Sequence, residues 1–323
     1  MLKMTAVVFG LVILLLASLW YIERLPSDVR EWLYLQVLNP SNDKEPEPQE
    51  FNFFVVGHLY GSPKIDNQLP ANLMIERLPY ILESKPDFMV SLGDVVFRKE
   101  QIEFTNLQEI FLSKLPFPFY NTPGNHDVAN NPALYESYFG TETYLGKRYG
   151  PAHLLFLDTE RVECGLDEPQ LMFLKEEIDQ ALIDPDTRFI FVFMHKTLVF
   201  QNLELRYLRS EKAMPNVWDC QKKSGDNPLM DTIFKPAARH KPVIIFAGDV
   251  GAWGNLSPYY DRDPWLPLTL VMTGLGDTPQ DNIIRVNVSP DGVHMDALFL
   301  DDMRSASLEE YDLDHWLEVA REE

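Results

Sequence analysis

The stretch Asn-Thr-Pro-Gly-Asn-His-Asp at residues 121–127 follows a short apolar run, residues 117–120, and predicts a strand that ends in a tight turn. The Pro-Gly pair suits such a turn, because proline presets φ and glycine tolerates the φ that a turn requires. The turn then presents three polar side chains in a row, Asn125, His126 and Asp127. An amide oxygen can bind a metal ion, an imidazole can carry a proton, and a carboxylate can orient the imidazole. Taken alone, the fragment is equally compatible with an ordinary polar turn.

Four other apolar runs also end at residues that can bind a metal ion or carry a proton. Ligands gather at the carboxyl ends of strands in α/β sheets. Five such ends in one chain therefore predict a functional site at a sheet edge. The runs and their polar ends are 53–56 before Gly57-His58, 89–92 before Gly93-Asp94, 189–194 before His195, and 243–247 before Gly248-Asp249.

Segments with a helical pattern alternate with these strands, and this alternation predicts an α/β layered fold. The last three apolar runs are expected to be antiparallel strands that close a sheet. The predicted helices and these final strands are, in order, 71–82, 107–115, 168–182, 268–272, 283–288 and 293–299.

The order and spacing of the polar blocks resemble those of the calcineurin-like metallophosphoesterases, over residues 51–300. That family carries Asp-x-His, Gly-Asp-x-x, Gly-Asn-His-Asp/Glu, a lone His and Gly-His-x-His. The resemblance implies an α/β/β/α sandwich with mixed sheets and a metal-dependent hydrolase of phosphoric esters. The blocks of this chain are Val-Gly-His-Leu-Tyr at 56–60, Gly93-Asp94, Gly-Asn-His-Asp at 124–127, His195, and Gly-Asp-Val-Gly at 248–251.

The resemblance implies a metal site made of four side chains. Asp94 would be the carboxylate that bridges two metal ions in the family, and Asn125 and His195 would bind the second ion. Asp249 stands where the family has a histidine and can offer an oxygen instead. Four ligands of these types suit a divalent ion such as Mn, Fe or Zn. We expect one well-bound ion here.

The resemblance also implies the catalytic roles. A metal-activated water would attack phosphorus, and His126 would contact the phosphoryl group and protonate the leaving oxygen as the general acid. Asp127, and with it Asp158, would orient the imidazole of His126. Lys196 either adds positive charge to the site or is a solvated surface lysine.

The first and last blocks depart from the family pattern. His58 and Tyr60 stand where the family has Asp and His, and Gly251 replaces the final His. A phenol with a pKa of about 10 is a poor ligand unless a metal such as Fe(III) lowers that pKa. The second metal is therefore expected to be weak or absent. His58 is expected to act as a base or as a phosphate contact in its place.

Three functions follow from this pattern. The first is a membrane-anchored phosphoesterase that hydrolyses a phosphate mono- or diester. The second is a catalytically inactive protein of the same fold that binds a ligand or a partner, as the lost ligands would suggest. The third is a hydrolase of a different ester. Retention of Asp94, Asn125, His126 and His195 favours the first, because a pure scaffold has no need of His126.

The N-terminus contains an uncharged run at residues 4–22, whose last three residues are Trp-Tyr-Ile. Nineteen residues rise roughly 28 Å as a helix, enough to cross the hydrocarbon core of a bilayer. We expect a single-pass transmembrane helix with the C-terminal domain exported to a periplasmic, extracellular or lumenal space. A cleaved signal peptide is the alternative, although no small-x-small cleavage site stands out.

The remaining organisation follows from composition. A chain with a formal net charge of −21 repels polyanions, so we do not expect it to bind nucleic acid. A small or lipid-linked phosphorylated substrate can still reach a site whose field is set by a metal ion. The acidic C-terminal tail is expected to dock on the domain.

Cys164 and Cys220 are expected either to form a disulfide or to remain two free thiols. The expected parts are an anchor at 1–22, a juxtamembrane segment and Pro-rich linker at 23–50, the phosphoesterase-like domain at 51–300 and the tail at 301–323.

Overall fold

A computed structural model describes most of the chain after the predicted linker. The chain divides into two units, Met1–Glu47 and Pro48–Glu323. The predicted anchor at residues 4–22 and nearly all of the linker lie outside the described residues. Within the described residues, no helix has both the length and the apolar character needed to cross a membrane. The described residues are 48–65, 69–128, 132–140, 142–199, 220, 228–250 and 257–321.

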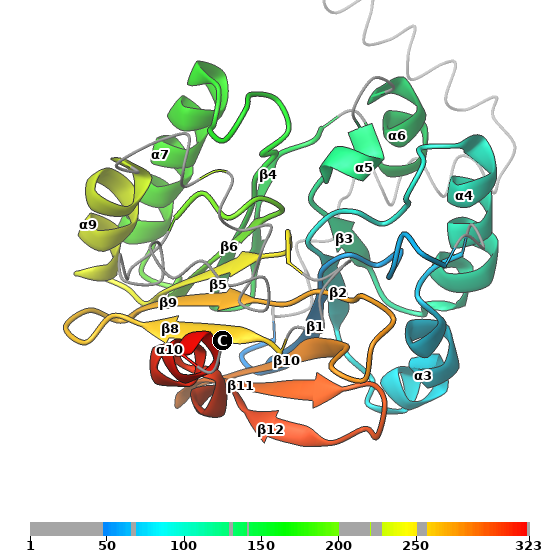
Figure 1. The fold of residues 1–323 in the computed structure, drawn as a ribbon. Coiled ribbons are helices and arrows are strands. Elements are labelled where there is room, and N and C mark those ends of the chain that lie inside the picture. The colour runs from blue at the N-terminus through cyan, green and yellow to red at the C-terminus, as the bar shows by residue number, and fades with distance from the viewer. Residues whose placement is uncertain are drawn as a thin grey trace, which may run out of the picture. The chain divides into compact units, whose positions relative to one another are not determined.

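Two six-stranded mixed sheets form the centre of the second unit, as Figure 1 shows. The first sheet has the order β12 Ser305–Ser307, β11 Gly292–Phe299, β10 Asn282–Ser289, β1 Phe51–Val56, β2 Phe88–Ser91 and β3 Phe119–Asn121. The second has the order β4 Leu145–Tyr149, β5 Ala152–Phe156, β6 Phe189–Met194, β7 Val243–Ala247, β9 Leu268–Met272 and β8 Tyr259–Arg262.

The central strands are apolar on both faces because both faces are buried. On β1, Phe53 packs between the sheets while its neighbour Phe54 packs against the helices outside. On β6, Phe191 and Phe193 face the same inner layer, and the rings of Phe53 and Phe191 lie 5.5 Å apart. This aromatic layer holds the two sheets together.

Helices cover the outer face of each sheet, so the predicted α/β class with two mixed sheets is confirmed (Figure 1). The helix α7 begins where Asp167 accepts a hydrogen bond from the amide of Gln170, with a proline in the first turn. Helices α7 Glu168–Ile183 and α9 Lys235–Ala238 pack on the second sheet. Helices α3 Asn72–Glu83, α4 Gln101–Asn106, α5 Asn125–Val128 and α6 Pro132–Phe139 belong to the side of the first sheet.

Two expectations about secondary structure were wrong. The strand β9 was expected to be antiparallel and to share a sheet with the two strands that follow it. It instead runs parallel to β7 in the second sheet, whereas β10 and β11 form an antiparallel hairpin in the first. Its sequence Leu-Thr-Leu-Val-Met is buried throughout, as is typical of a central parallel strand. The helix expected at 107–115 begins earlier, at Gln101, because Glu100 and Glu103 form a capping box.

The C-terminal tail packs on the domain, as expected. The strand β12 pairs with β11, and helix α10 Leu313–Arg321 follows. Trp316 in this helix is buried, and its indole N–H donates to the carbonyl of Pro258 at 3.3 Å.

The two cysteines form a disulfide, which decides between the alternatives that the sequence leaves open. Cys164 lies in the loop after β5, and Cys220 lies in the segment between β6 and β7. Their Cα atoms are 4.9 Å apart. The bond ties these two connections together beside the carboxyl ends of the second sheet.

Candidate metal centre

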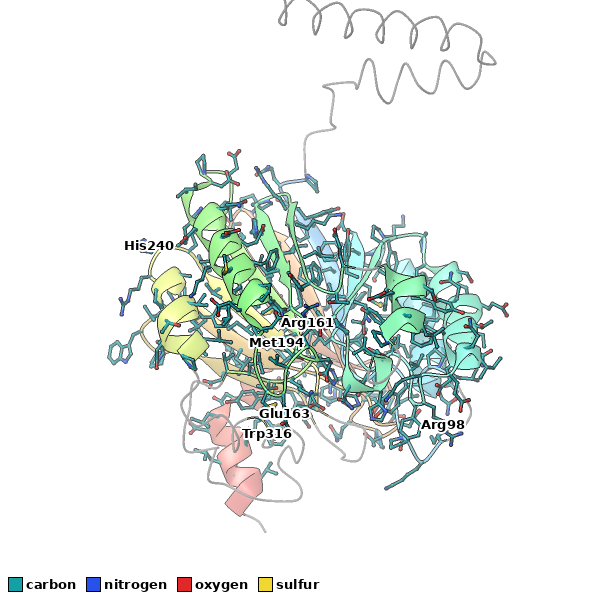
Figure 2. The ribbon with its side chains drawn as sticks, turned by 90° about the horizontal axis from the view of Figure 1, so that it is seen from above. Arg98, Arg161, Glu163, Met194, His240 and Trp316 are labelled. Atoms are coloured by element: carbon teal, nitrogen blue, oxygen red, sulfur yellow. A yellow bond between two sulfur atoms is a disulfide. The ribbon has the colours of Figure 1, made fainter. Side chains whose placement is uncertain are left out.

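Five strand ends bring together the side chains that the sequence singled out. The centre of the cluster is Nε2 of His195, after β6, whose last residue Met194 is labelled in Figure 2. This atom lies 3.2 Å from Oδ1 of Asn125, 3.5 Å from Oδ1 of Asp94 and 3.8 Å from Oδ1 of Asp249. All four predicted metal ligands therefore face one point, at the edge where β2, β3, β6 and β7 end.

His58 joins this cluster beside two of the predicted ligands. Its Nε2 is 3.6 Å from Oδ2 of Asp94 and 3.5 Å from Oδ1 of Asp249. One donor atom each from His58, Asp94 and His195 lies within 4.8 Å of the others. His58 is thus placed to act as a metal ligand as well as in the base or phosphate-contact role predicted from sequence.

The donor atoms fit a divalent ion. Ligands about 2.1 Å from one ion are separated by roughly 3.0–3.4 Å in octahedral or tetrahedral geometry, which is near the 3.2–3.8 Å observed around His195. Both ring nitrogens of His58 and Oδ2 of Asp94 are buried without a hydrogen-bond partner among the described residues. Buried polar atoms are normally satisfied, so these orphaned atoms indicate a missing partner. A mixed imidazole, carboxylate and amide set suits Mn, Fe or Zn.

The backbone at the centre is held in an uncommon conformation. His58 has φ 48° and Asp94 has φ 57°, both in the left-handed region that non-glycine residues seldom adopt. Gly93 has φ 88°, and a Cβ atom there would lie 2.8 Å from Nδ1 of His195 and from the amide of Gly124. Such strain gathers at functional sites, where the surrounding structure enforces it. The two ligand loops therefore approach each other as closely as glycine permits.

His195 presents Nε2 to the cluster because its other nitrogen is engaged. Nδ1 lies 2.8 Å from the carbonyl oxygen of Leu92, which can only accept, so Nδ1 carries the hydrogen. Burial lowers the pKa of His195, but the nearby carboxylates of Asp94, Asp249 and Glu160 outweigh it and raise the pKa to about 9. A metal ion at Nε2 therefore competes with a proton.

Asp127 holds the backbone of the ligand loops and does not orient His126, which corrects the expectation from sequence. Its Oδ2 accepts hydrogen bonds from the amides of Asp94 and Gly124, both at 2.8 Å, and its Oδ1 accepts one from Val95 at 2.8 Å. Burial and the charge of Asp94 outweigh these bonds and raise the pKa of Asp127 to about 7. The carboxylate is fully used by backbone donors, so none of its oxygens is available to an imidazole.

The imidazole of His126 is oriented by the loop after β2 instead. Its Nδ1 lies 2.6 Å from the carbonyl oxygen of Phe97, and its ring stacks on the Phe97 ring with centroids 5.1 Å apart. The backbone amide of His126 donates to Oδ1 of Asp94 at 2.9 Å. With Nδ1 directed at a carbonyl, Nε2 is the atom that can hand a proton to a substrate.

Tyr60 lies between the two halves of the site. Its ring centroid is 5.3 Å from that of His58 and 5.2 Å from that of His126. Burial and the carboxylates of Asp94 and Asp249 raise the pKa of Tyr60 above its usual value. The weak metal binding expected of this phenol stays a prediction. Gly251 lies outside the described residues.

One charged residue of the site was not expected from sequence. The side chain of Glu160 is only 7% exposed, and its Oε2 lies 2.6 Å from Nζ of Lys196. Lys196 is therefore neither a solvated lysine nor an unpaired charge. Asp158, predicted to orient His126, accepts the amide of Glu160 at 2.9 Å and shapes this loop instead. Glu160 belongs to the sequence Leu-Asp-Thr-Glu at 157–160. Its ion pair with Lys196 could not be predicted, because the pair depends on which strand ends are neighbours.

Comparison with known proteins agrees with this geometry. A protein-family model described as calcineurin-like phosphoesterase matches residues 67–234. A search among curated proteins finds no match. The fold is similar to that of GAP50, the anchor in the inner membrane complex of Plasmodium, with a TM-score of 0.55, 12% identity, and coverage of 81% of this chain and 89% of that one.

Two solved phosphatase structures share the fold as well. One is a dimetal phosphatase from Danio rerio, with a TM-score of 0.55, 12% identity, and coverage of 80% of this chain and 98% of that one. The other is the purple acid phosphatase PPD1 from yellow lupin (Lupinus luteus), with a TM-score of 0.52, 11% identity, and coverage of 81% and 53%. At these identities the structures establish likeness of fold.

Proposed function

This chain belongs to the calcineurin-like phosphoesterase family, and from that premise we propose that it is a metal-dependent hydrolase of a phosphate mono- or diester. The observation that supports the proposal best is the convergence of oxygens of Asp94, Asn125 and Asp249 within 3.2–3.8 Å of Nε2 of His195. Such a set has no role in a protein that only uses the fold as a scaffold. His126, beside it, has the orientation of a proton donor.

We propose that these four side chains hold one divalent ion, of Mn, Fe or Zn. When bound, the ion supplies Lewis-acid chemistry to the phosphate ester and lowers the pKa of a water molecule. The protein residues fix the geometry: the carbonyl of Leu92 sets the tautomer of His195, and the amide of His126 fixes one oxygen of Asp94. Preorganised ligands of this kind save the cost of ordering them at each turnover.

His126 is proposed to protonate the leaving oxygen through Nε2. The carbonyl of Phe97 accepts the hydrogen of Nδ1, so Nε2 is the ring nitrogen left for the substrate. His58 is proposed either to complete the metal coordination or to contact the phosphoryl group. Its two ring nitrogens lack other partners among the described residues, which leaves them free for either task.

The substrate and the location are proposals from the sequence. A small or lipid-linked phosphorylated molecule suits a site whose charge is set locally by a metal ion in a chain of net charge −21. The uncharged run at residues 4–22 is proposed to anchor the chain in a membrane, with the enzyme domain exported.

A second candidate function is binding without catalysis. His58 and Asp249 exchange the residue types that the family has at these positions, and Gly251 removes a ligand altogether. A site altered in this way could hold a phosphorylated ligand without hydrolysing it. The similar GAP50 structure is described as an anchor, which is consistent with such a use of the fold.

The test is metal analysis of the purified full-length chain together with hydrolysis of 4-nitrophenyl phosphate and bis(4-nitrophenyl) phosphate. We expect about one metal ion per chain. Asp249→Ala is expected to lose the ion, and His126→Ala is expected to keep the ion but lose hydrolysis. His294→Ala is the matched control, because its side chain is 76% exposed on β11. No retained metal and no hydrolysis with any of Mn, Fe or Zn would favour the binding function.

A further inference from the structure

The ion pair between Lys196 and Glu160 forms beside the metal centre and is mostly shielded from water. The Lys196 side chain is 19% exposed and that of Glu160 is 7% exposed. Taking two charges out of water costs about as much as their attraction returns. The pair is therefore weak evidence for added stability, and its position calls for another explanation.

Lys196 is fixed to a strand end that carries a metal ligand, and Glu160 lies in the loop after the neighbouring strand β5. Lys196 directly follows His195, and its amide donates to Oγ1 of Thr159 at 3.0 Å. The carbonyl of His195 in turn accepts the amides of Gly248 and Asp249 at 2.9 and 2.8 Å. In Figure 2 the labelled Arg161 and Met194 mark the chain just after Glu160 and just before His195. The ammonium group is thus held between the segment that follows the ligand His195 and the loop after β5.

The ammonium group also has donors to spare. A lysine Nζ carries three N–H donors, and Glu160 accepts one of them at 2.6 Å. Among the described residues this is the hydrogen-bond partner of Nζ, and a fifth of the side chain remains open to solvent. Glu160 therefore positions the ammonium group and leaves it able to bind a further acceptor.

We propose that Lys196, positioned by Glu160, binds a phosphoryl oxygen of the substrate and selects phosphate monoesters over diesters. This inference rests on the proposed function of the same site. At position 251 a glycine stands where the family has a metal-binding histidine, and His58 and Tyr60 replace the Asp and His of the family's first motif. A centre with one ion offers less positive charge than a centre with two. A terminal phosphate is a dianion with three free oxygens, whereas a diester is a monoanion with two. A fixed ammonium group therefore favours the monoester.

The first experiment measures binding of inorganic phosphate to the full-length chain by calorimetry, both after chelation and with Mn. Lys196→Met is expected to weaken phosphate about tenfold in both states, as the loss of one charge-assisted hydrogen bond implies. Glu160→Gln keeps an acceptor but removes the opposing charge, so it is expected to bind phosphate as tightly as the unchanged chain or more tightly. Lys235→Met is the control, because Lys235 pairs with Asp231 at 2.7 Å on the exposed surface.

The second experiment compares kcat/KM for 4-nitrophenyl phosphate and for bis(4-nitrophenyl) phosphate. Lys196→Met should lower the monoester-to-diester ratio, and Lys196→Arg should restore part of it by restoring the charge. A phosphate affinity within twofold of the unchanged chain in Lys196→Met, at an unaltered melting temperature, would overturn the proposal. So would an unchanged chain that binds no phosphate. If Lys196→Met still hydrolyses both esters with an unchanged monoester-to-diester ratio, the role of Lys196 is rejected but the proposed hydrolase function stands. If the unchanged chain hydrolyses neither ester but binds phosphate in a way that depends on Lys196, only the proposed catalysis is rejected.

Discussion

Replacing Asp127 by alanine should destabilise the domain more than its lack of direct substrate contact suggests. Its carboxylate accepts the buried amides of Asp94, Val95 and Gly124, each at 2.8 Å. Each buried donor left without a partner costs about 1–3 kcal/mol. Asp127→Ala is therefore expected to lower the free energy of unfolding by at least about 3 kcal/mol. For a domain of this size that corresponds to a fall in melting temperature of about 6 °C.

Asp127→Asn separates charge from hydrogen bonding. The amide keeps one oxygen, so either the pair at Asp94 and Gly124 or the donor at Val95 loses its acceptor, and the expected loss is about half that of alanine. Differential scanning fluorimetry and denaturant unfolding of the two variants provide the measurement. Asp179→Ala, an exposed position in α7, is the control and should stay within about 0.5 kcal/mol. If Asp127→Ala also stays within that range, water or another group already satisfies the amides and the reasoning fails.

Three further predictions follow from other parts of the domain. The disulfide between Cys164 and Cys220, 56 residues apart, should leave no thiol for alkylation in non-reduced protein, and Cys220→Ser should cost on the order of 4 kcal/mol by the chain-entropy model; two labelled thiols would contradict it. Burial outweighs backbone hydrogen bonds and raises the pKa of Asp281 from 3.8 to about 6. The protonated Asp281 side chain therefore adds its full contribution to the free energy of unfolding below pH 4, and this contribution is lost as the pH rises through 6. Unfolding at stepped pH should show the unchanged chain losing about 3 kcal/mol relative to Asp281→Asn over that interval, and the opposite slope would mean that the hydrogen bonds dominate. Gly93→Ala should lose about 2 kcal/mol more than Gly140→Ala, because both glycines have φ near 90° but described atoms lie within 4 Å of an added Cβ only at Gly93; equal melting temperatures would argue against the close approach.

The sequence was sufficient to predict the polar ends of the strands. Each ligand block directly follows a buried apolar run, and the carboxyl ends of neighbouring parallel strands meet at one edge. The positions of Asp94 and His195 in space follow from this rule without any knowledge of side-chain contacts. The α/β class follows from the same alternation of strands and helices.

The partners of the polar side chains could not be predicted in the same way. Asp127 was paired with its sequence neighbour His126, yet it binds amides of the loop after β2, about thirty residues earlier in the chain. Glu160 and Lys196 are 36 residues apart and meet only because β5 and β6 are adjacent. Local sequence gives the residue types of a site, whereas hydrogen bonding within it depends on which strands are neighbours.

Strands β4 and β8 were not predicted, because their sequences are short and partly polar. The strand β4 reads Leu-Gly-Lys-Arg-Tyr, and β8 reads Tyr-Tyr-Asp-Arg. Neither has the continuous apolar run of a central strand, because each lies at the margin of its sheet. The order of strands, in particular the placement of β9 beside β7, depends on long connections that carry no periodic signal.

The margins of the two sheets also bear on how copies of this chain could associate. An open sheet offers unpaired amides and carbonyls at each outer strand, and such strands can recruit a strand from another molecule. Here β3 and β12 have three residues each, and β4 and β8 carry Lys147, Arg148 and Arg262 within them. Short and charged outer strands discourage edge-to-edge joining. We therefore expect folded copies of this chain to associate through helices and loops rather than through these four outer strands.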